Sequence, residues 1–267
     1  MYFERHTYEN QALPIFFSRQ LRSASEPRFD LHWHETAEWI YVKSGRVEIR
    51  INDVITEYKP NDIIFISPQQ PHSFRCPEGE AVYYCLIPDN SITRSAGLDT
   101  RTLFVKNPIH DETIREIYDG IIRECTETET GYASMTIANI VRMTVLAVRH
   151  HSDPGVKKSL LDDNAMRITK DVICYMEDHY AEDFSGETLA AHLGFSRSYL
   201  CHIVSKVTGQ SLTENLLYIR CRKAKELLKK GVSVGDASYS AGFKNTSYFC
   251  RVYKRMMGVS PSSHRNK

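Results

Sequence analysis

Apolar and polar residues alternate over short distances in the first third of the chain. Such alternation is typical of half-buried strands, and it is clearest in residues 47–51, where apolar and polar side chains take turns. Turn-forming residues separate the runs, for example Ser44-Gly45 and Lys59-Pro60-Asn61. The predicted strands cover residues 13–19, 38–42, 47–51, 63–66 and 81–87. Many short strands with regular turns predict a small sandwich or barrel.

The pattern then changes to a helical period. Residues 109–124 and 134–150 carry apolar side chains three and four positions apart, which predicts two amphipathic helices. The apolar positions are Ile114, Ile117, Ile121 and Ile122 in the first helix, and Ile137, Ile140, Val141, Thr144, Val145 and Val148 in the second. We expect this pair to pack on the barrel. A polar linker at residues 152–163 follows, and Asn164 begins the next helix.

One short phrase occurs twice near the end of the chain, as Gly194-Phe195-Ser196 followed by Ser198-Tyr199-Leu200, and as Gly242-Phe243 followed by Ser247-Tyr248-Phe249. In each copy a short helix ends at the glycine and a second helix follows, which predicts two helix-turn-helix units. Buried stripes are expected at Leu200, Ile203, Val204 and Val207, and at Phe249, Val252, Tyr253 and Met256. Residues 212–230 between the units predict one long connecting helix.

The polar face of each second helix is left for a partner. A helix of this kind can lie in a DNA major groove, and two of them about 34 Å apart would enter successive grooves. The expected DNA-binding residues are Arg197, Ser198, Cys201, His202, Ser205 and Lys206 in the first copy, and Lys244, Asn245, Thr246, Ser247, Cys250, Arg251 and Lys254 in the second. Arg251 is the strongest candidate for reading a base, because a guanidinium can make two hydrogen bonds to guanine.

These motifs resemble a known family. The glycine turns, Arg220-x-x-x-Ala224-x-x-Leu227-Leu228 and Gly258-Val259-Ser260-Pro261 look like the DNA-binding domain of the AraC/XylS family of bacterial transcription regulators. The resemblance covers about residues 164–265 and implies a seven-helix domain with two helix-turn-helix units. Three residues depart from the family pattern: Ala237 and Ser238, where looser packing is expected, and Asn215, which replaces a tyrosine.

A second motif lies among the predicted strands. His32, His34 and Glu38 share parity, so one strand would direct them to one face, and His72, on the turn after Pro68, could join them. The spacing resembles a cupin domain, which implies a cavity that senses an effector; Asn61 departs from this pattern at a glycine position. Three imidazoles and a carboxylate suit a divalent transition metal such as iron, manganese, nickel or zinc, or they line an organic effector pocket. Suggested pocket neighbours are Trp33, Trp39, Tyr83, Tyr84 and Arg28.

Charge divides the chain in the same way. From residue 164 onward there are sixteen Lys and Arg against nine Asp and Glu, a net +7, whereas the preceding residues carry eighteen against twenty-four, a net −6. A basic domain suits a phosphate-rich partner. Seven cysteines without a C-x-x-C pair indicate neither a disulfide framework nor a zinc ribbon. No leader or long apolar stretch is evident, so we expect a soluble cytoplasmic protein without membrane contact.

Together these features predict an α+β chain with four parts. Residues 1–107 form an effector-sensing barrel, 108–151 a helical pair that joins a homodimer, 152–163 a linker, and 164–267 the DNA-binding domain. The predicted function is a transcription regulator controlled by a small molecule or a metal, with promoter DNA as partner and RNA polymerase as a second partner of an activator. The alternative is a metal-dependent cupin enzyme with an accessory DNA-binding domain. Effector, operator, pathway and the direction of regulation leave no trace in the sequence.

Overall fold

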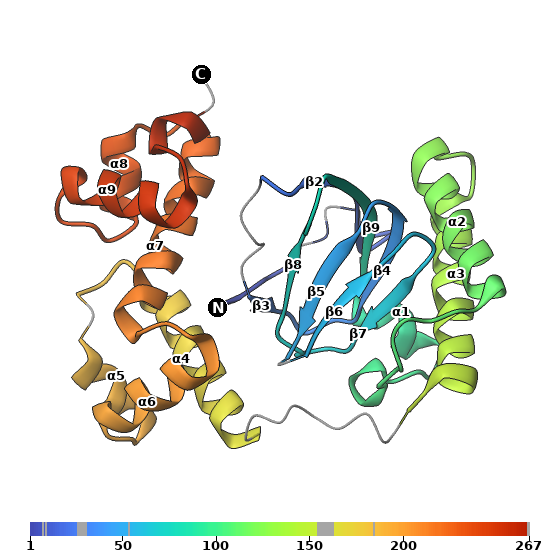
Figure 1. The fold of residues 1–267 in the computed structure, drawn as a ribbon, viewed down its shortest axis with the longest axis horizontal. Helices are drawn as coiled ribbons and strands as arrows, with labels where there is room; N and C mark the ends of the chain where they lie inside the picture. Colours follow the sequence, from blue (N-terminus) through green and yellow to red (C-terminus); the bar gives the residue numbers. More distant parts are fainter. Residues whose placement is uncertain are drawn as a thin grey trace. The chain divides into compact units, whose positions relative to one another are not determined.

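The computed structural model describes residues 1–6, 8, 10–25, 31–52, 54–153, 163–183 and 185–265. The chain forms two compact units (Figure 1). We call Glu4–Leu160 the barrel unit; the helical unit consists of Leu161–Lys267 together with Met1–Phe3. The α+β fold class is confirmed, with a β-rich first part and a helical last part. Of the predicted linker, residues 154–162 lie outside the described residues.

The barrel unit contains two antiparallel sheets (Figure 1). One has the strand order β2 (Ile15–Ser23), β9 (Glu80–Pro88), β4 (Glu38–Ser44) and β7 (Ile63–Ile66), and the other contains β3 (His32–Trp33), β8 (His72–Arg75), β5 (Val47–Ile51) and β6 (Val54–Tyr58) in this order. The predictions for β5 and β7 match to the residue. The strands β6 and β8 were not predicted, because β6 exposes its apolar Val54 and Ile55 and β8 has only four residues.

The expectation of one strand through His32, His34 and Glu38 is wrong. Strand β3 ends at Trp33, and β4 begins only at Glu38. His72 lies in β8 rather than on a turn, and its partner across the sheet is His32. The turn before β7 places Asn61 at φ +73°, a left-handed conformation that asparagine tolerates better than most residues. This explains why asparagine can stand where the cupin pattern has glycine.

Two helices cover the outside of the β2-β9-β4-β7 sheet. They are α2 (Glu112–Glu127) and α3 (Tyr132–Leu146), and the chain continues from α3 into a π-helical turn, Ala147–His151. Helix α2 begins later than predicted, because Ile109 pairs with Ile63 as a β-bridge and Asp111 caps the helix by accepting a hydrogen bond from the Ile114 backbone. Val148, expected to face inward, is 40% exposed.

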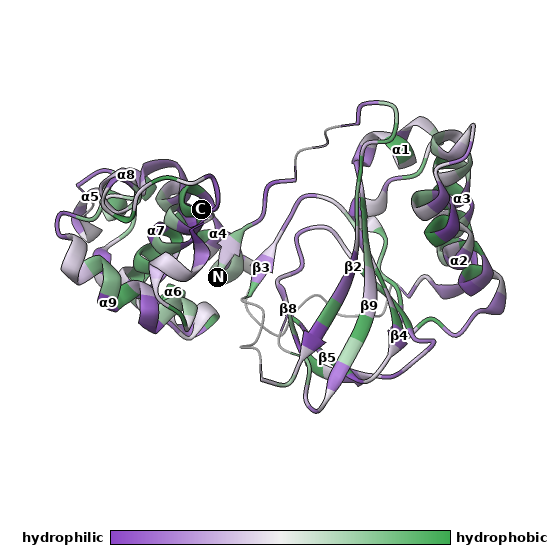
Figure 2. Cartoon of the chain, turned by 90° about the horizontal axis from the view of Figure 1, so that it is seen from above, coloured by the Kyte–Doolittle hydropathy of each residue, from purple (hydrophilic) through white to green (hydrophobic). Residues whose placement is uncertain are grey.

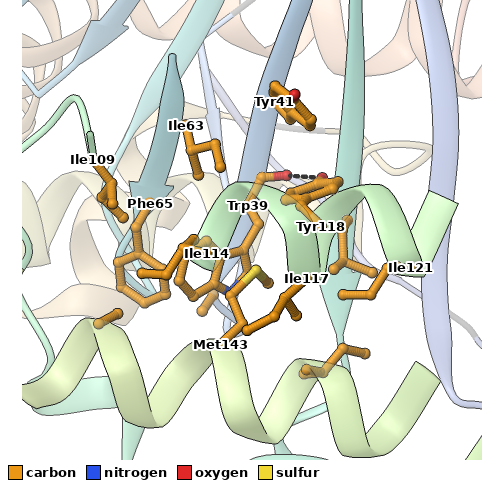
Figure 3. Close-up of a cluster of buried hydrophobic side chains, with 14 of the residues drawn as sticks. Trp39, Tyr41, Ile63, Phe65, Ile109, Ile114, Ile117, Tyr118, Ile121 and Met143 are labelled. Atoms are coloured by element: carbon orange, nitrogen blue, oxygen red, sulfur yellow. Dashed lines mark hydrogen bonds between the residues drawn. The ribbon is translucent and has the colours of Figure 1, made fainter. Parts of the chain in front are cut away.

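The buried faces of α2 and α3 meet the barrel in one hydrophobic cluster (Figure 3). Ile114, Ile117 and Ile121 of α2 pack with Met143 of α3 and with strand residues that include Trp39, Tyr41 and Phe65. The Tyr118 hydroxyl donates a hydrogen bond to the Trp39 carbonyl at 2.9 Å. Both helices carry hydrophobic and hydrophilic residues, as an amphipathic helix on a sheet requires (Figure 2). The expected packing of the helical pair on the barrel is therefore confirmed.

The helical unit contains the two predicted helix-turn-helix units. The first consists of α5 (Gly186–Leu193) and α6 (Arg197–Thr208), and the second of α8 (Val234–Ser240) and α9 (Thr246–Met257). They are preceded by α4 (Asp163–His179), connected by α7 (Leu212–Lys229) and followed by the 3-10 turn Pro261–His264. Gly194 adopts φ +74°, the left-handed conformation expected where the first helix ends, and Gly242 adopts the same conformation at φ +83°.

The three residues that depart from the family pattern are all buried. Ala237 and Ser238 are fully buried in α8, and the Ser238 hydroxyl has no hydrogen-bond partner among the described residues. Asn215 is also fully buried. Its side-chain amide donates to the Thr208 hydroxyl and to the carbonyls of Gln210 and Ser211, which holds the turn between α6 and α7.

The first three residues, expected in the barrel, belong to the helical unit and include the short strand β1 (Tyr2–Phe3). Tyr2 is 5% exposed, and the Arg222 guanidinium lies over its ring at 3.8 Å. The Met1 amino group donates a hydrogen bond to Asn215 Oδ1 at 3.1 Å. A segment from the start of the chain is therefore part of the packed surface of the helical unit.

Candidate functional site

The recognition helices, α6 and α9, each present one polar face. In α6 the apolar stripe Leu200, Ile203, Val204 and Val207 is buried, and in α9 Phe249, Val252 and Tyr253 are buried while Met256 is partly exposed. The opposite faces contain the residues expected to bind DNA. All thirteen are exposed or partly exposed; the partly exposed ones are Cys201, Thr246 and Cys250. The sequence pattern thus assigned the exposed faces correctly, although their contacts with DNA stay a prediction.

Each recognition helix has an ion pair near its N-terminus. Arg197 Nη1 lies 2.8 Å from Glu187 Oε1 of α5, and Lys244 Nζ lies 2.7 Å from Asp183 Oδ1. All four side chains are more than half exposed. Two of the predicted cationic contacts therefore face an acidic partner, and an incoming phosphate would have to compete with that carboxylate. Arg251 and Lys254, in contrast, lie further along α9 and are exposed.

Helix α7 and the glycine turn at Gly242 connect the two helix-turn-helix units of the helical unit. Arg220 of α7 donates hydrogen bonds to the carbonyls of Tyr180 and Glu182, in the loop between α4 and α5. The turn at Gly242 packs on the same loop so closely that an added Cβ would lie 2.8 Å from the Ala181 Cα atom. The loop that precedes the first helix-turn-helix unit is thus in direct contact with the turn of the second.

The barrel unit brings His32, His34, Glu38 and His72 together, as the sequence predicted. All four are buried, and one ligand atom of each lies within 4.8 Å of the others. Glu38 Oε2 lies 3.2 Å from His34 Nε2 and 2.8 Å from His72 Nε2, while the Cys85 thiol donates to Glu38 Oε1 at 2.9 Å. Burial would raise the pKa of Glu38, but the neighbouring His72 and His34 hold this pKa well below its usual value. We call these four residues the histidine cluster.

The histidine cluster has a donor arrangement that fits a divalent metal. His34 Nδ1 lies 2.8 Å from the Thr36 carbonyl, and His72 Nδ1 lies 2.8 Å from the Gln70 carbonyl. A carbonyl only accepts hydrogen bonds, so each Nδ1 carries the proton and each Nε2 faces Glu38 with its lone pair when the ring is neutral. Metal-binding histidines are commonly oriented in this way. Without a metal, His72 Nε2 can carry a proton and donate it in a hydrogen bond to Glu38. Burial would lower the pKa of His72, but Glu38 raises it.

A cavity of about 240 Å³ adjoins the histidine cluster. Its wall includes His32 and Glu38, and also residues that the sequence did not indicate: Glu4, Phe16, Gln20, Arg22, Phe74, Cys85 and Ile87. Of the suggested pocket neighbours, Tyr83 lines the cavity, and burial raises its pKa to about 12. Trp33 is buried but does not line the cavity, and Arg28 lies outside the described residues.

The suggestion of Trp39 and Tyr84 as pocket neighbours is wrong. Both pack in the hydrophobic cluster under α2 and α3. Successive side chains of a strand point to opposite faces, and Glu38 already faces the cavity from β4, so Trp39 must face away. The same alternation on β9 would have found Tyr83, Cys85 and Ile87 on one face. Glu4 carries no such signal, because it precedes the strands of the barrel.

Two known domain families and several known proteins are similar to parts or most of this chain. A helix-turn-helix domain family matches residues 189–267, and a cupin domain family matches residues 23–88. The transcriptional activator RhaR of Pectobacterium atrosepticum is 26% identical over 255 residues, which cover 91% of this chain and 88% of that protein. The uncharacterised HTH-type regulator YbfI of Bacillus subtilis is 23% identical, with 83% and 81% covered.

Solved structures with a similar fold include ToxT from Vibrio cholerae. One ToxT structure matches with a TM-score of 0.54 and 17% sequence identity, covering 94% of this chain and 97% of the other. A ligand-free ToxT variant matches with a TM-score of 0.57 and 16% identity. Across the described residues of the present chain, no helix is long and apolar enough to cross a membrane.

Proposed function

Because this chain belongs to the AraC/XylS family of transcription regulators, we propose that its helical unit binds promoter DNA through α6 and α9 and that its barrel unit controls this binding. The observation that supports the proposal is the pair of exposed polar faces on two matched helix-turn-helix units of one compact domain. Each face would enter a major groove, and α7 would keep the two recognition helices at a fixed separation.

The individual DNA contacts fall into two classes. Arg251 is exposed near the centre of α9, where a guanidinium can reach a guanine edge. The cationic side chains better suited to phosphates are Lys206, Lys254, Arg197 and Lys244, because a positive charge attracts the phosphate of any nucleotide equally. Of these, Arg197 and Lys244 must first leave their acidic partners. The remaining polar residues, such as Ser198, His202 and Ser247, supplement this readout.

The cavity beside the histidine cluster is the proposed effector site. It combines the buried polar groups His32 and Glu38 with an apolar wall, and it lies in the barrel unit rather than in the DNA-binding unit. One related structure, that of ToxT, contains an unsaturated fatty acid, which supports small-molecule control in this fold. The histidine cluster fits a divalent metal, so a metal is the second candidate occupant of the same site.

Two further partners follow from the same arrangement. Two apolar residues of the helical pair are exposed: Met135 lies on α3, and Val148 lies in the turn that follows α3. We propose that this surface joins two subunits. An activator of this type would also contact RNA polymerase. A regulator that binds promoter DNA acts where the DNA is, so we propose that this protein works in the bacterial cytoplasm.

A footprint on genomic promoter fragments tests the proposal. The full chain is compared with and without candidate effectors, divalent metals included, and an occupied cavity should change operator affinity or transcription output. Failure of the full chain to protect any fragment at modest salt would contradict the DNA-binding function. Equal affinity and equal output in the presence and absence of every effector that binds would contradict control by the barrel.

Arg251→Ala tests the base-reading contact. The substitution should weaken operator binding by about 1–3 kcal/mol and relax the preference at one base position. Selection from a library of randomised operators measures both quantities, with Lys254→Ala as the control that should lower affinity for all sequences alike. A uniform loss in Arg251→Ala would make this residue a phosphate contact instead.

A further inference from the structure

A second group of metal-binding side chains lies next to the histidine cluster. Glu4, His6 and His34 each offer one ligand atom, and these three atoms lie within 4.8 Å of one another. Glu4 lines the cavity and its side chain is 29% exposed, whereas the side chain of His6 is 10% exposed and that of His34 is 2% exposed. These three residues, which we call the rim group, therefore reach from the cavity wall to the buried cluster.

Both imidazoles of the rim group have an Nε2 atom that can bind a cation. His6 Nε2 is buried, lies 3.4 Å from Glu4 Oε2, and makes no hydrogen bond of good geometry among the described residues. His34 donates through Nδ1 to the Thr36 carbonyl at 2.8 Å, so its Nε2 carries a lone pair when the ring is neutral. A buried polar atom without a hydrogen bond costs stability, and a cation held by all three residues would remove that cost at His6.

The distances in the rim group suit a small divalent ion. Zinc lies about 2.0–2.2 Å from imidazole nitrogens and carboxylate oxygens, so two ligands of a tetrahedral ion are about 3.3–3.6 Å apart. The 3.4 Å between Glu4 Oε2 and His6 Nε2 falls in this range. The ligand atom of His34 lies within 4.8 Å of both, a separation that side-chain rotation can close.

The donor types of the rim group favour a transition metal. Imidazole is a preferred ligand of zinc, iron, nickel and copper, whereas Mg²⁺ and Ca²⁺ are bound by oxygen atoms. Only one of the three donors, the Glu4 carboxylate, is an oxygen ligand. Two imidazoles and one carboxylate also form the ligand set of open zinc sites, in which water or a further ligand takes the fourth position.

The rim group shares only His34 with the histidine cluster. His34 Nε2 lies 3.2 Å from Glu38 Oε2, and one imidazole nitrogen binds one ion at a time. An ion in the rim group would take His34 from Glu38, which would keep its contacts with His72 Nε2 at 2.8 Å and with the Cys85 thiol at 2.9 Å. The two metal positions can therefore be told apart by substituting a residue that only one of them uses.

We propose that Glu4, His6 and His34 hold a zinc ion at the edge of the barrel cavity. Two of the three protein ligands come from the segment before β2, and the third directly follows β3, so the ion fixes this segment to the barrel. The inference goes beyond the proposed function, because it assigns a metal position outside the histidine cluster and does not require that the chain binds DNA.

Zinc titration of the full chain tests the rim group. The protein is stripped with EDTA, dialysed, and titrated with Zn²⁺ by calorimetry, with Mg²⁺ as an ion that should not bind. His6→Ala should weaken zinc binding at one site by at least about 10-fold, because the loss of a residue that merely orients a ligand already costs about 10- to 100-fold. His110→Ala removes an imidazole of the same unit that is 66% exposed, and it should leave zinc binding unchanged.

Crystals of the full chain grown with Zn²⁺ locate the ion directly. An anomalous difference map at the zinc absorption edge should show a peak about 2.0–2.2 Å from Glu4, His6 and His34. The map separates the rim group from the histidine cluster, since Glu4 and His6 are ligands of the rim position alone.

Several results would overturn the inference. Equal zinc affinity in His6→Ala and the wild type, a zinc peak that contacts neither Glu4 nor His6, or the absence of zinc binding by the wild type would each do so. Tryptophan fluorescence verifies the barrel fold of the variant, and Glu4→Gln, which keeps the shape of the side chain, replaces it should His6→Ala unfold. Footprints of the wild type separate the two levels: DNA binding without a zinc ion in the rim group contradicts this inference alone, whereas failure to bind DNA contradicts the proposed function.

Discussion

In the barrel unit the charged groups are buried and face one another, whereas on the recognition helices they are exposed and face solvent or a single acidic partner. Glu38 is 3% exposed and contacts two imidazoles and a thiol, while Arg197 is 61% exposed and contacts one carboxylate. The loss of one partner of a buried charge strongly reduces the stability of the fold, whereas the loss of the partner of an exposed charge changes stability little, because water replaces it. The barrel therefore is suited to detect a change of occupant, and the helices are suited to exchange one anion for another.

Glu38→Ala should give the largest effect. It removes the carboxylate that accepts a hydrogen bond from the Cys85 thiol and that lies against the imidazoles of His34 and His72, and we expect a loss of about 3–5 kcal/mol in the free energy of unfolding of the barrel unit. Urea titration followed by tryptophan fluorescence measures this unit by itself, because both tryptophans, Trp33 and Trp39, lie in it.

Glu187→Ala is the matched control for that experiment. It removes the exposed partner of Arg197 and should change unfolding of the helical unit by less than about 1 kcal/mol. Circular dichroism follows the loss of helix, most of which belongs to the helical unit. Equal costs for the two substitutions would remove the contrast between the buried and the exposed ion pairs.

The two glycine turns allow a second comparison, inside the helical unit. Gly194→Ala should cost about 1–2 kcal/mol of unfolding free energy, because alanine is strained at φ +74° but has open space for its Cβ. Gly242→Ala should cost clearly more, since its Cβ would lie 2.8 Å from both the Ala181 Cα atom and the Tyr180 carbonyl oxygen. Thermal unfolding of both variants gives the difference. The same melting temperature for both would show that the contact between the second turn and the 180–183 loop contributes nothing.

The smallest effect concerns the ion pairs at the recognition helices. Glu187→Gln and Asp183→Asn should each raise DNA affinity slightly, because Arg197 and Lys244 no longer have to leave a carboxylate before they bind a phosphate. Fluorescence anisotropy with an operator fragment at two salt concentrations measures this gain. Asp171→Asn on α4 changes the net charge equally and serves as the control. An equal gain in all three variants would reduce the effect to net charge.

The sequence predicted the helical unit more completely than the barrel. Its signals are local: a serine that caps a helix, a glycine that ends one, and an apolar stripe within twelve residues, as in Ser196, Gly194 and α6. The residues of the histidine cluster could be predicted because they form a motif. The break between β3 and β4 that separates them could not. Glu4 and Arg22 reach the cavity from distant parts of the sequence, and only strand pairing and packing bring them there.

The helical unit is built from both ends of the chain, and this affects where the protein can be cut into separate fragments. Tyr2 fills a surface beside Tyr218 and Arg222, so a fragment that starts at the interdomain linker would expose an aromatic ring and a guanidinium that are covered in the full chain. A chimera that exchanges DNA specificity between two such regulators should therefore transfer the first three residues along with the last hundred or so. Otherwise the surface around Tyr218 and Arg222 would lack the residues that cover it in the full chain.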